Sequence, residues 1–212
     1  MSGEAGGVVA VVDDDPAVRE AISSLLRSVG LDVVEYASAR EFLDAASPDR
    51  PNCIVLDVRM PGLSGLDLQE ALVRAGAHPQ IVFITAHGDI PMAVRAMKAG
   101  AVEFLPKPFR EHDLLDAVWA ALRRDGQARE LRDTVAVLRA RFDTLTDRER
   151  EIVDPVVAGR LNKQVAAVLG VSEQTVKVHR HNVMRKMGAE SLPDLVRMIE
   201  LLRSDDGRPR TD

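Results

Sequence analysis

The sequence predicts an α/β fold, a doubly wound sheet of five parallel strands, followed by a smaller all-helical domain. Short apolar runs alternate with stretches of helical periodicity in the front of the chain, which is typical of a parallel sheet covered by helices. Polar residues follow these apolar runs, at the carboxyl ends of strands where such sheets bind ligands. The back of the chain shows helical periodicity alone.

Turn residues separate the predicted elements of the sheet domain. Pro16 and Pro91 suit the first turn of a helix, where the missing N–H has no partner to lose. Gly30, Gly76 and Gly100 each follow a helical stretch, where a left-handed C-cap favours glycine. We therefore expect strands at 8–12, 32–36, 52–57, 80–84 and 102–105, and helices at 16–29, 38–46, 64–75, 90–99 and 111–124.

A helical segment follows the sheet domain. Its apolar residues recur at three- and four-residue steps, and they are Leu131, Val135, Leu138, Phe142 and Leu145. Gly126 is a weak helix former and offers a hinge. Two interpretations stay open: a helical linker, either unpaired or paired as a short helix, or a single amphipathic helix lying on its own domain. We divide the chain into a sheet domain at 1–124, a linker at 125–143 and a helical domain at 144–212.

The helical domain is predicted to contain four helices, at 146–158, 162–170, 172–187 and 192–202. Thr146 and Glu149 form a capping box, and Asn162 and Ser172 are expected to cap the next two helices. Pro155 lies inside the first of them, so that helix should kink or end early. The polar residues from Ser204 onward and the Gly-rich start at 1–7 are expected to be disordered or mobile tails.

Charge is unevenly distributed along the 212 residues, whose hydrophobic fraction of 46% supports packed cores. Residues 1–124 carry 12 Lys and Arg against 18 Asp and Glu, whereas residues 160–187 carry 6 against Glu173 alone. This pattern favours cation binding in front and polyanion binding behind. Cys53 is the only cysteine, so no intrachain disulfide can form. No membrane-spanning run or signal peptide is visible, so we expect a cytoplasmic protein without a membrane partner.

Five polar side chains should meet at one edge of the predicted sheet, because parallel strands align their carboxyl ends there. They are Asp13, Asp14, Asp57, Thr85 and Lys107. Carboxylates this close repel one another unless cations neutralise them, and Mg²⁺ takes oxygen ligands of this kind. A carboxylate, a metal, an ammonium and a hydroxyl together suit phosphoryl transfer onto the carboxylate. The alternative is an acidic strand edge that merely closes the sheet.

The same positions carry a family resemblance. The motifs are Val11-Val12-Asp13-Asp14-Asp15, Ile54-Val55-Leu56-Asp57-Val58-Arg59-Met60-Pro61-Gly62, Thr85-Ala86-His87 and Lys107-Pro108-Phe109. Residues 7–124 resemble the flavodoxin-like receiver domain of two-component response regulators. The resemblance implies phosphorylation of Asp57 by a sensor histidine kinase, Mg²⁺ on Asp14, Asp57 and the carbonyl of Arg59, and help from Asp13 through water. It also implies phosphoryl contacts from Lys107 and Thr85 and a cis Lys107–Pro108 bond.

Phe104 matches the aromatic position of that family which swings inward on activation. From the residues alone it reads as ordinary core, because it alternates with Val102 in a strand. Phosphorylation adds about two negative charges, which would draw Thr85 toward the site and leave space for a ring. The surface around residues 90–105 would then respond to phosphorylation.

The helices at 162–170 and 172–187 form a helix-turn-helix pattern. The first carries Val165 through Leu169 toward a core, and the second places Val176, Val183 and Met187 on one face. Its other face is either a DNA-reading surface or a solvated charged face. Residues 144–202 resemble the LuxR-type DNA-binding domain through Leu145-Thr146-Asp147-Arg148-Glu149-Arg150-Glu151, Asn162-Lys163-Gln164-Val165-Ala166, Thr175-Val176-Lys177-Val178-His179-Arg180, Val183-Met184-Arg185-Lys186-Met187 and Ser191-Leu192-Pro193-Asp194-Leu195-Val196. The whole chain is most similar to FixJ-like response regulators.

This second resemblance implies that Lys177, Val178 and His181 face the major groove of promoter DNA. Thr175, His179 and Arg185 would contact the DNA backbone. We expect a non-enzymatic transcription factor that dimerises on phosphorylation and activates transcription with RNA polymerase. The alternatives are a Mg²⁺-dependent phosphohydrolase with Asp57 as nucleophile, and a receiver that acts by protein contacts alone. Arg59 argues against the first, because that pattern needs a second Asp there.

Overall fold

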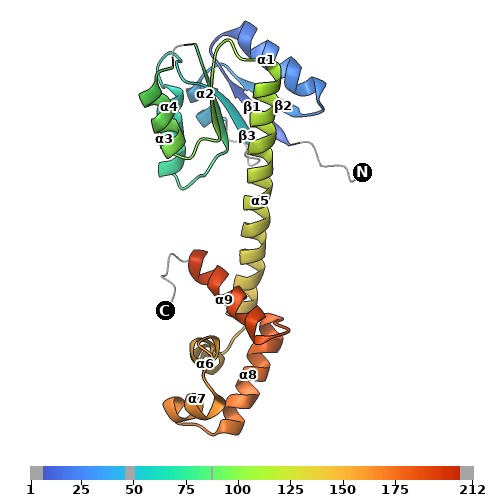
Figure 1. Cartoon of the computed structure of the whole chain (residues 1–212), viewed down its shortest axis with the longest axis vertical. Helices are drawn as coiled ribbons and strands as arrows, with labels where there is room; N and C mark the ends of the chain where they lie inside the picture. The colour runs from blue at the N-terminus through green and yellow to red at the C-terminus, as the bar shows by residue number, and fades with distance from the viewer. Residues whose placement is uncertain (1–6, 46–50, 87, 206–212) are drawn as a thin grey trace. The chain divides into compact units, whose positions relative to one another are not determined.

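The structure, a computed structural model, describes residues 7–45, 51–86 and 88–205 (Figure 1). The chain divides into two compact units, unit 1 at residues 1–128 and unit 2 at residues 129–212. Most of the expected mobile start at 1–7 and of the expected tail from Ser204 lies outside the described residues, but Ser204 and Asp205 belong to the last helix, Leu192–Asp205, so the tail was predicted to begin two residues too early. The predicted domain ranges with a linker at 125–143 stay a prediction.

Unit 1 contains one sheet of five parallel strands in the order β2-β1-β3-β4-β5. The strands are β1 (Val8–Val12), β2 (Asp32–Tyr36), β3 (Cys53–Asp57), β4 (Ile81–Thr85) and β5 (Glu103–Pro106). The central strands consist of residues buried on both faces, which explains their continuous apolar runs. The predicted α/β fold class is confirmed.

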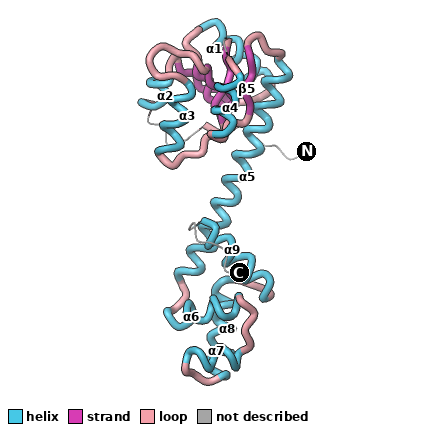
Figure 2. The backbone as a smooth tube through the Cα atoms, turned by 60° about the vertical axis from the view of Figure 1, so that its left-hand side comes forward, coloured by secondary structure: helices cyan, strands magenta, loops and turns pink. Residues whose placement is uncertain are grey.

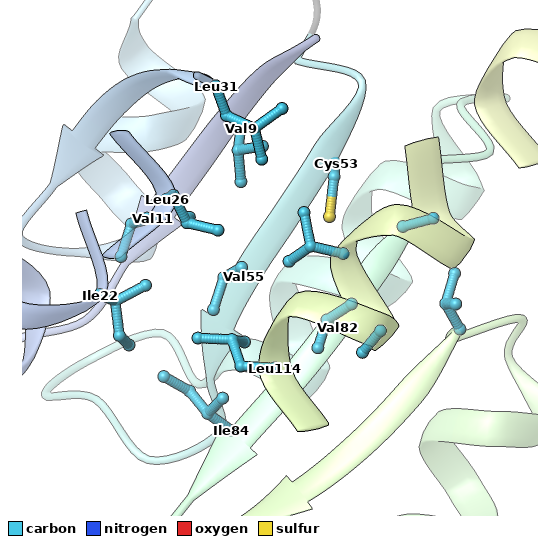
Figure 3. Close-up of a cluster of buried hydrophobic side chains, with 14 residues drawn as sticks. Val9, Val11, Ile22, Leu26, Leu31, Cys53, Val55, Val82, Ile84 and Leu114 are labelled. Atoms are coloured by element: carbon cyan, nitrogen blue, oxygen red, sulfur yellow. The ribbon is translucent and has the colours of Figure 1, made fainter. Parts of the chain in front are cut away.

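Helices cover both faces of this sheet (Figure 2). They are α1 (Pro16–Ser28), α2 (Ala39–Asp44), α3 (Gly65–Arg74), α4 (Ile90–Lys98) and α5 (Glu111–Asp143). Ile22 of α1 and Leu114 of α5 belong to the cluster on one face, together with Val55 (Figure 3). Leu68 of α3 and Ala96 of α4 belong to the cluster on the other face. Each predicted helix of unit 1 is present; the ends of α1 to α4 differ by at most two residues, whereas α5 continues to Asp143 instead of ending at 124.

Helix α5 runs without interruption through Gly126, so the predicted hinge is absent from the structure. Val135 and Leu138 are buried in the core of unit 2, and Phe142 packs against that core. The burial of Val135 and Leu138 favours a helix that packs on its own domain over one that pairs with a second copy through these residues. Leu131, 51% exposed, is the member of the predicted stripe that stays at the surface.

Unit 2 is helical beyond α5 and contains α6 (Asp147–Val157), α7 (Asn162–Leu169), α8 (Glu173–Met187) and α9 (Leu192–Asp205). The capping box of Thr146 and Glu149 is present, and Ser172 caps α8 as expected. Gly170 and Gly188 end α7 and α8 in the left-handed conformation that favours glycine.

Three details of unit 2 differ from expectation. Helix α6 continues through Pro155, which lies in its last turn, so the predicted early end is wrong. Leu161 is the N-cap of α7, and its N–H donates to Oε1 of Gln164, so Asn162 is the first helical residue instead. Val168 is 63% exposed, although we expected it to face the core, because Val165 and Ala166 already fill the buried face of this short helix.

Candidate functional site

The predicted site residues of unit 1 gather at the carboxyl edge of the sheet. Asp13 follows β1, Asp57 ends β3 and Thr85 ends β4. The backbone N–H of Lys107 donates to the carbonyl of Thr85 at 2.7 Å, which places Lys107 beside the ends of these strands. In the sheet, β1 lies next to β3. At this point the strand order reverses, because β2 is added on one side of β1 and β3 to β5 on the other, and folds of this type bind ligands there.

Lys107 joins two carboxylates at the centre of this edge. Its Nζ lies 2.6 Å from Oδ2 of Asp13 and 2.9 Å from Oδ1 of Asp57. Both Asp side chains are almost fully buried, while 19% of the Lys107 side chain is exposed. One ammonium thus neutralises part of the charge of two buried carboxylates and leaves a net negative site. The Lys107–Pro108 peptide bond is cis, as the resemblance implied.

Backbone N–H groups near the carboxylates of Asp13 and Asp57 donate hydrogen bonds to them. Oδ2 of Asp57 accepts a hydrogen bond from the N–H of Arg59 at 2.8 Å. Oδ1 of Asp13 accepts from the N–H of Asp15 at 2.9 Å. These bonds hold the loops after β1 and β3 against their own carboxylates. Asp14 lies between the fixed residues Asp13 and Asp15, and its side chain is exposed.

Burial and neighbouring charges shift the pKa values of two groups in this site. Burial raises the pKa of the Asp57 carboxyl, and the nearby Asp13 carboxylate raises it further, against the opposing effect of Lys107 and the N–H of Arg59. Burial alone would lower the pKa of Lys107, but hydrogen bonds to Asp13 and Asp57 outweigh it and raise the pKa. The ammonium therefore stays charged, and the site favours a further cation near Asp57.

The donor atoms at this edge are those that Mg²⁺ takes. Among the described residues, no three His, Cys, Asp or Glu side chains converge as metal ligands. Mg²⁺ does not need three, because it keeps several waters and binds through one or two carboxylates. The carboxylates of Asp14 and Asp57 and the carbonyl oxygen of Arg59 are hard oxygen donors in or beside the loops at this edge, and Asp13 adds a further carboxylate. The residues present fit the ion.

Thr85 and Phe104 lie together beside this edge. Thr85 is fully buried, and the Phe104 ring is half-buried with its centre 6.2 Å from that of Phe83. A Cβ atom built on Gly88 would come within 2.7 Å of both Cε1 of Phe104 and Cγ2 of Thr85. The ring and the threonine methyl therefore fill one small space that only a glycine at 88 leaves open. Gly88 therefore lies against both of the residues that the sequence singled out as a switch.

Helix α8 separates a buried face from a polar one. Val176, Val183 and Met187 are buried, as expected. The predicted groove residues Lys177, Val178 and His181 are exposed, as is Arg185, and 50% of Val178 is accessible. His179 is half-buried. Thr175 is also half-buried, and its hydroxyl lies 2.8 Å from that of Ser172 at the start of the helix.

The buried ion pair that Lys186 forms was not predicted from the sequence. We counted it with the basic residues of 160–187, but its Nζ lies 2.6 Å from Oε2 of Glu149 and 3.0 Å from the carbonyl of Thr144. Glu149 is 3% exposed, so this ion pair belongs to the core of unit 2. Lys186 and Glu149 are far apart in sequence, and charge alone gave no signal for their pairing.

Two family models match the chain. The model described as "Response regulator receiver domain" matches residues 9–119, and "Bacterial regulatory proteins, luxR family" matches residues 143–199. The chain is 56% identical to nodulation protein W of Bradyrhizobium diazoefficiens over 92% of this chain and 86% of that protein. It is 47% identical to the transcriptional regulatory protein FixJ of Azorhizobium caulinodans over 95% and 97% of the two chains.

A solved structure agrees with these matches. The response regulator StyR superimposes with a TM-score of 0.80 at 50% identity, covering 92% of this chain and 99% of that one. The families matched are those of regulators, not of enzymes, which removes the phosphohydrolase alternative. No described helix is both long and apolar enough to cross a membrane. The chain belongs to the FixJ-like two-component response regulators, which regulate transcription through a receiver domain and a LuxR-type DNA-binding domain.

Proposed function

We propose that a sensor histidine kinase transfers a phosphoryl group to Asp57 and that this event switches DNA binding by unit 2. The observation that carries the proposal is the bridge of Lys107 between the buried carboxylates of Asp13 and Asp57. A buried aspartate is suited to accept a phosphoryl group when an ammonium is fixed beside it and further oxygen donors lie at the same edge of the sheet.

The transfer needs one bond to form and one to break. A carboxylate oxygen of Asp57 attacks phosphorus, the bond from phosphorus to the kinase histidine breaks, and its electron pair stays on the imidazole nitrogen. Asp14, Asp57 and the Arg59 carbonyl would hold Mg²⁺, which would supply positive charge to offset that of the phosphoryl oxygens. Lys107 already lies 2.9 Å from Asp57, so its ammonium is in place to hold one of those oxygens.

Thr85 and Phe104 couple the phosphoryl group to the surface of unit 1. The hydroxyl of Thr85 moves toward the new acceptor oxygens, and the Phe104 ring follows into the space that the threonine leaves. Because Gly88 lies against both Thr85 and Phe104, a shift of Thr85 changes the space that Gly88 and the Phe104 ring occupy. Strand β5 and the start of α4 lie beside this contact and respond to it.

Helix α4 presents an apolar stripe suited to a second copy of the chain. Ile90, Val94 and Met97 recur at helical spacing and are 81%, 45% and 44% exposed. Exposed apolar positions in one row favour a protein interface, and the stripe begins beside the switch residues. We infer that the phosphorylated chain dimerises through α4 and β5, so that two copies of α8 bind a two-fold site in promoter DNA.

Unit 2 would then bind double-stranded promoter DNA in the cytoplasm and activate transcription with RNA polymerase. Lys177, Val178 and His181 would meet base edges, because they are exposed near the amino-terminal half of α8. Thr175, His179 and Arg185 would contact the DNA backbone, which fixes the register of the helix without reading sequence.

Phosphorylation of Asp57 can be tested directly. Incubation of the full chain with acetyl phosphate and Mg²⁺ should add one phosphoryl group by intact mass, and Asp57→Asn should abolish the addition. Asp116→Asn changes an exposed aspartate of α5 and should accept as much phosphoryl group as the wild type. Equal phosphorylation of the Asp57→Asn chain would overturn the proposal.

A further inference from the structure

Arg19, on α1, lies outside the phosphoacceptor site but contacts the backbone of the acidic loop Asp13–Asp15, which follows β1. Its Nη1 donates a hydrogen bond to the carbonyl oxygen of Asp13 at 2.6 Å. The Asp13 side chain is the one that binds Lys107. Arg19 therefore holds the main chain of a residue whose carboxylate is part of the site, while its own guanidinium forms an ion pair with Glu35, outside that site.

Arg19 is itself held in place on its other side. Its Nε lies 3.9 Å from Oε2 of Glu35 on β2, and Oε1 of the same carboxylate lies 2.9 Å from Nη2 of Arg27. The Arg19 side chain is 17% exposed, compared with 51% for Arg27. A guanidinium that is largely enclosed between a carboxylate and a carbonyl has little freedom to move. It makes a rigid strut between β2 and the loop.

The loop that Arg19 holds contains the proposed metal ligand Asp14. Asp13 is fixed from three directions, by Arg19 at its carbonyl, by Asp15 and Lys107 at its carboxylate, and by Tyr36 at its N–H. Asp15 is fixed as the N-cap of α1. Asp14, between them, has an exposed side chain, so its direction depends on the backbone on both sides.

We propose that Arg19 is a positioning residue for Mg²⁺ binding, resting on the proposed function of Asp57. By fixing the Asp13 carbonyl it sets the backbone conformation from Asp13 to Asp14 and so holds the Asp14 carboxylate ready for the ion. Residues that orient metal ligands from outside the coordination shell contribute about 10–100-fold to metal affinity in other sites.

The sign of the effect separates positioning from simple electrostatics. Arg19 is a cation near an acidic site, so its charge opposes the binding of another cation. If charge were its role, a neutral residue at 19 would tighten Mg²⁺ binding. If it only stabilised the fold, Mg²⁺ affinity would not change. Positioning alone predicts that a neutral residue weakens Mg²⁺ binding.

The experiment measures the Kd for Mg²⁺ of the full chain by calorimetric titration without any phosphodonor. Arg19→Met should raise this Kd about tenfold, at the lower end of the range for such residues. Arg19→Lys keeps the charge and one donor, and should raise it about two- to threefold. Arg27→Met is the matched control, because it removes the other partner of Glu35 without touching the acidic loop, and should stay within about twofold of the wild type.

A second measurement separates this proposal from the proposed function. The rate of phosphorylation by acetyl phosphate should fall in Arg19→Met at limiting Mg²⁺ and recover at saturating Mg²⁺. A wild-type chain that is phosphorylated normally while Arg19→Met binds Mg²⁺ equally well or better would overturn the role of Arg19 alone. A wild-type chain that neither binds Mg²⁺ nor accepts phosphoryl groups would overturn both. If Arg19→Met does not fold, an unchanged Kd in Arg19→Lys is the result that overturns the role.

Discussion

The side-chain amide of Gln69, on α3, donates a hydrogen bond to the backbone carbonyl of Ala96 on α4 across 3.2 Å. The same Nε2 atom donates to the carbonyl of Ala99 at 3.3 Å. Gln69 is 2% exposed, so these bonds form away from water. An exposed ion pair between Glu70 and Arg95 joins the same two helices. The C-terminal end of α4 is thus fastened to α3, while its other end lies beside the proposed switch.

Replacing Gln69 by leucine should lower the free energy of unfolding of unit 1 by about 1–3 kcal/mol. The volume is similar, but helix carbonyls of α4 lose a donor in a buried place. Urea denaturation followed by circular dichroism measures the loss. Gln127→Leu, at an exposed position of α5, is the control and should change stability by less than about 0.5 kcal/mol. Equal midpoints for the two variants would contradict the role of Gln69.

The Glu149–Lys186 pair should make unit 2 less stable in acid. Burial alone would raise the pKa of Glu149, but Lys186 and Thr146 outweigh it and hold the pKa below its ordinary value. A carboxylate with a lowered folded pKa stabilises the fold above its unfolded value of about 4.3. That stabilisation is lost as the pH falls through the folded pKa.

Glu149→Gln should therefore lower the stability of unit 2 at neutral pH by about 1–3 kcal/mol. The difference from wild type should shrink as the pH falls below about 4. Thermal unfolding at a series of pH values tests this. Glu151→Gln breaks an exposed pair with Arg148 instead, and should cost less than about 0.5 kcal/mol. A Glu149→Gln deficit that persists undiminished in acid would show that the charge is not responsible.

The apolar stripe of α4 should determine dimerisation. Val94→Lys places a charge in the proposed interface and should weaken the phosphorylated dimer about tenfold or more, a loss of about 1.4 kcal/mol. Sedimentation of the phosphorylated chain measures the Kd. Val34→Lys, at 43% exposure on β2, matches Val94 at 45% and should leave the dimer unchanged. Equal dimerisation of both variants would point to activation by another route.

The exposed face of α8 should separate base contacts from backbone contacts. Val178→Ala should relax preference at one base position and leave the salt dependence of binding unchanged, because an apolar side chain contacts a base such as thymine through its methyl group. Arg185→Ala should weaken binding to all sequences and lower the salt slope by about one. Lys177→Ala should show a mixture of both effects.

A panel of operator variants at several salt concentrations measures these three changes. Uniform loss of affinity in Val178→Ala would mean that this residue packs within unit 2. Absence of any salt-dependent DNA shift in the wild type would favour a receiver that acts through protein contacts alone.

The strands and the acidic edge of the sheet could be predicted from sequence because each is encoded locally. A run such as Val8 to Val12 specifies a buried strand, and the polar residue after it specifies the edge. Parallel connections then bring Asp13, Asp57 and Lys107 together without further information. The switch pair of Thr85 and Phe104 followed from the family resemblance, since alternation alone described Phe104 as core.

Contacts between residues that are far apart in sequence could not be predicted. The strut from Arg19 to Asp13 depends on the angle at which α1 leaves β1, which periodicity does not report. The packing partners of Val135 and Leu138 could not be decided from the sequence, because an apolar stripe on a helix can pack against a second copy of the chain or against the core of its own domain. Val168 was misplaced because α7 is short and buries only Val165 and Ala166.

The ion pair of Lys186 with Glu149 places this position of α8 under a different evolutionary constraint from the exposed positions of the same helix. A substitution at Lys186 leaves a buried carboxylate unmatched and harms folding before it alters DNA recognition. Substitutions at the exposed positions 177, 178 and 181 leave the core intact and are free to accumulate. Under the proposed DNA contacts, duplicated copies of this regulator can acquire new operators by changing these exposed positions, while Lys186 and the buried face of α8 keep the domain folded.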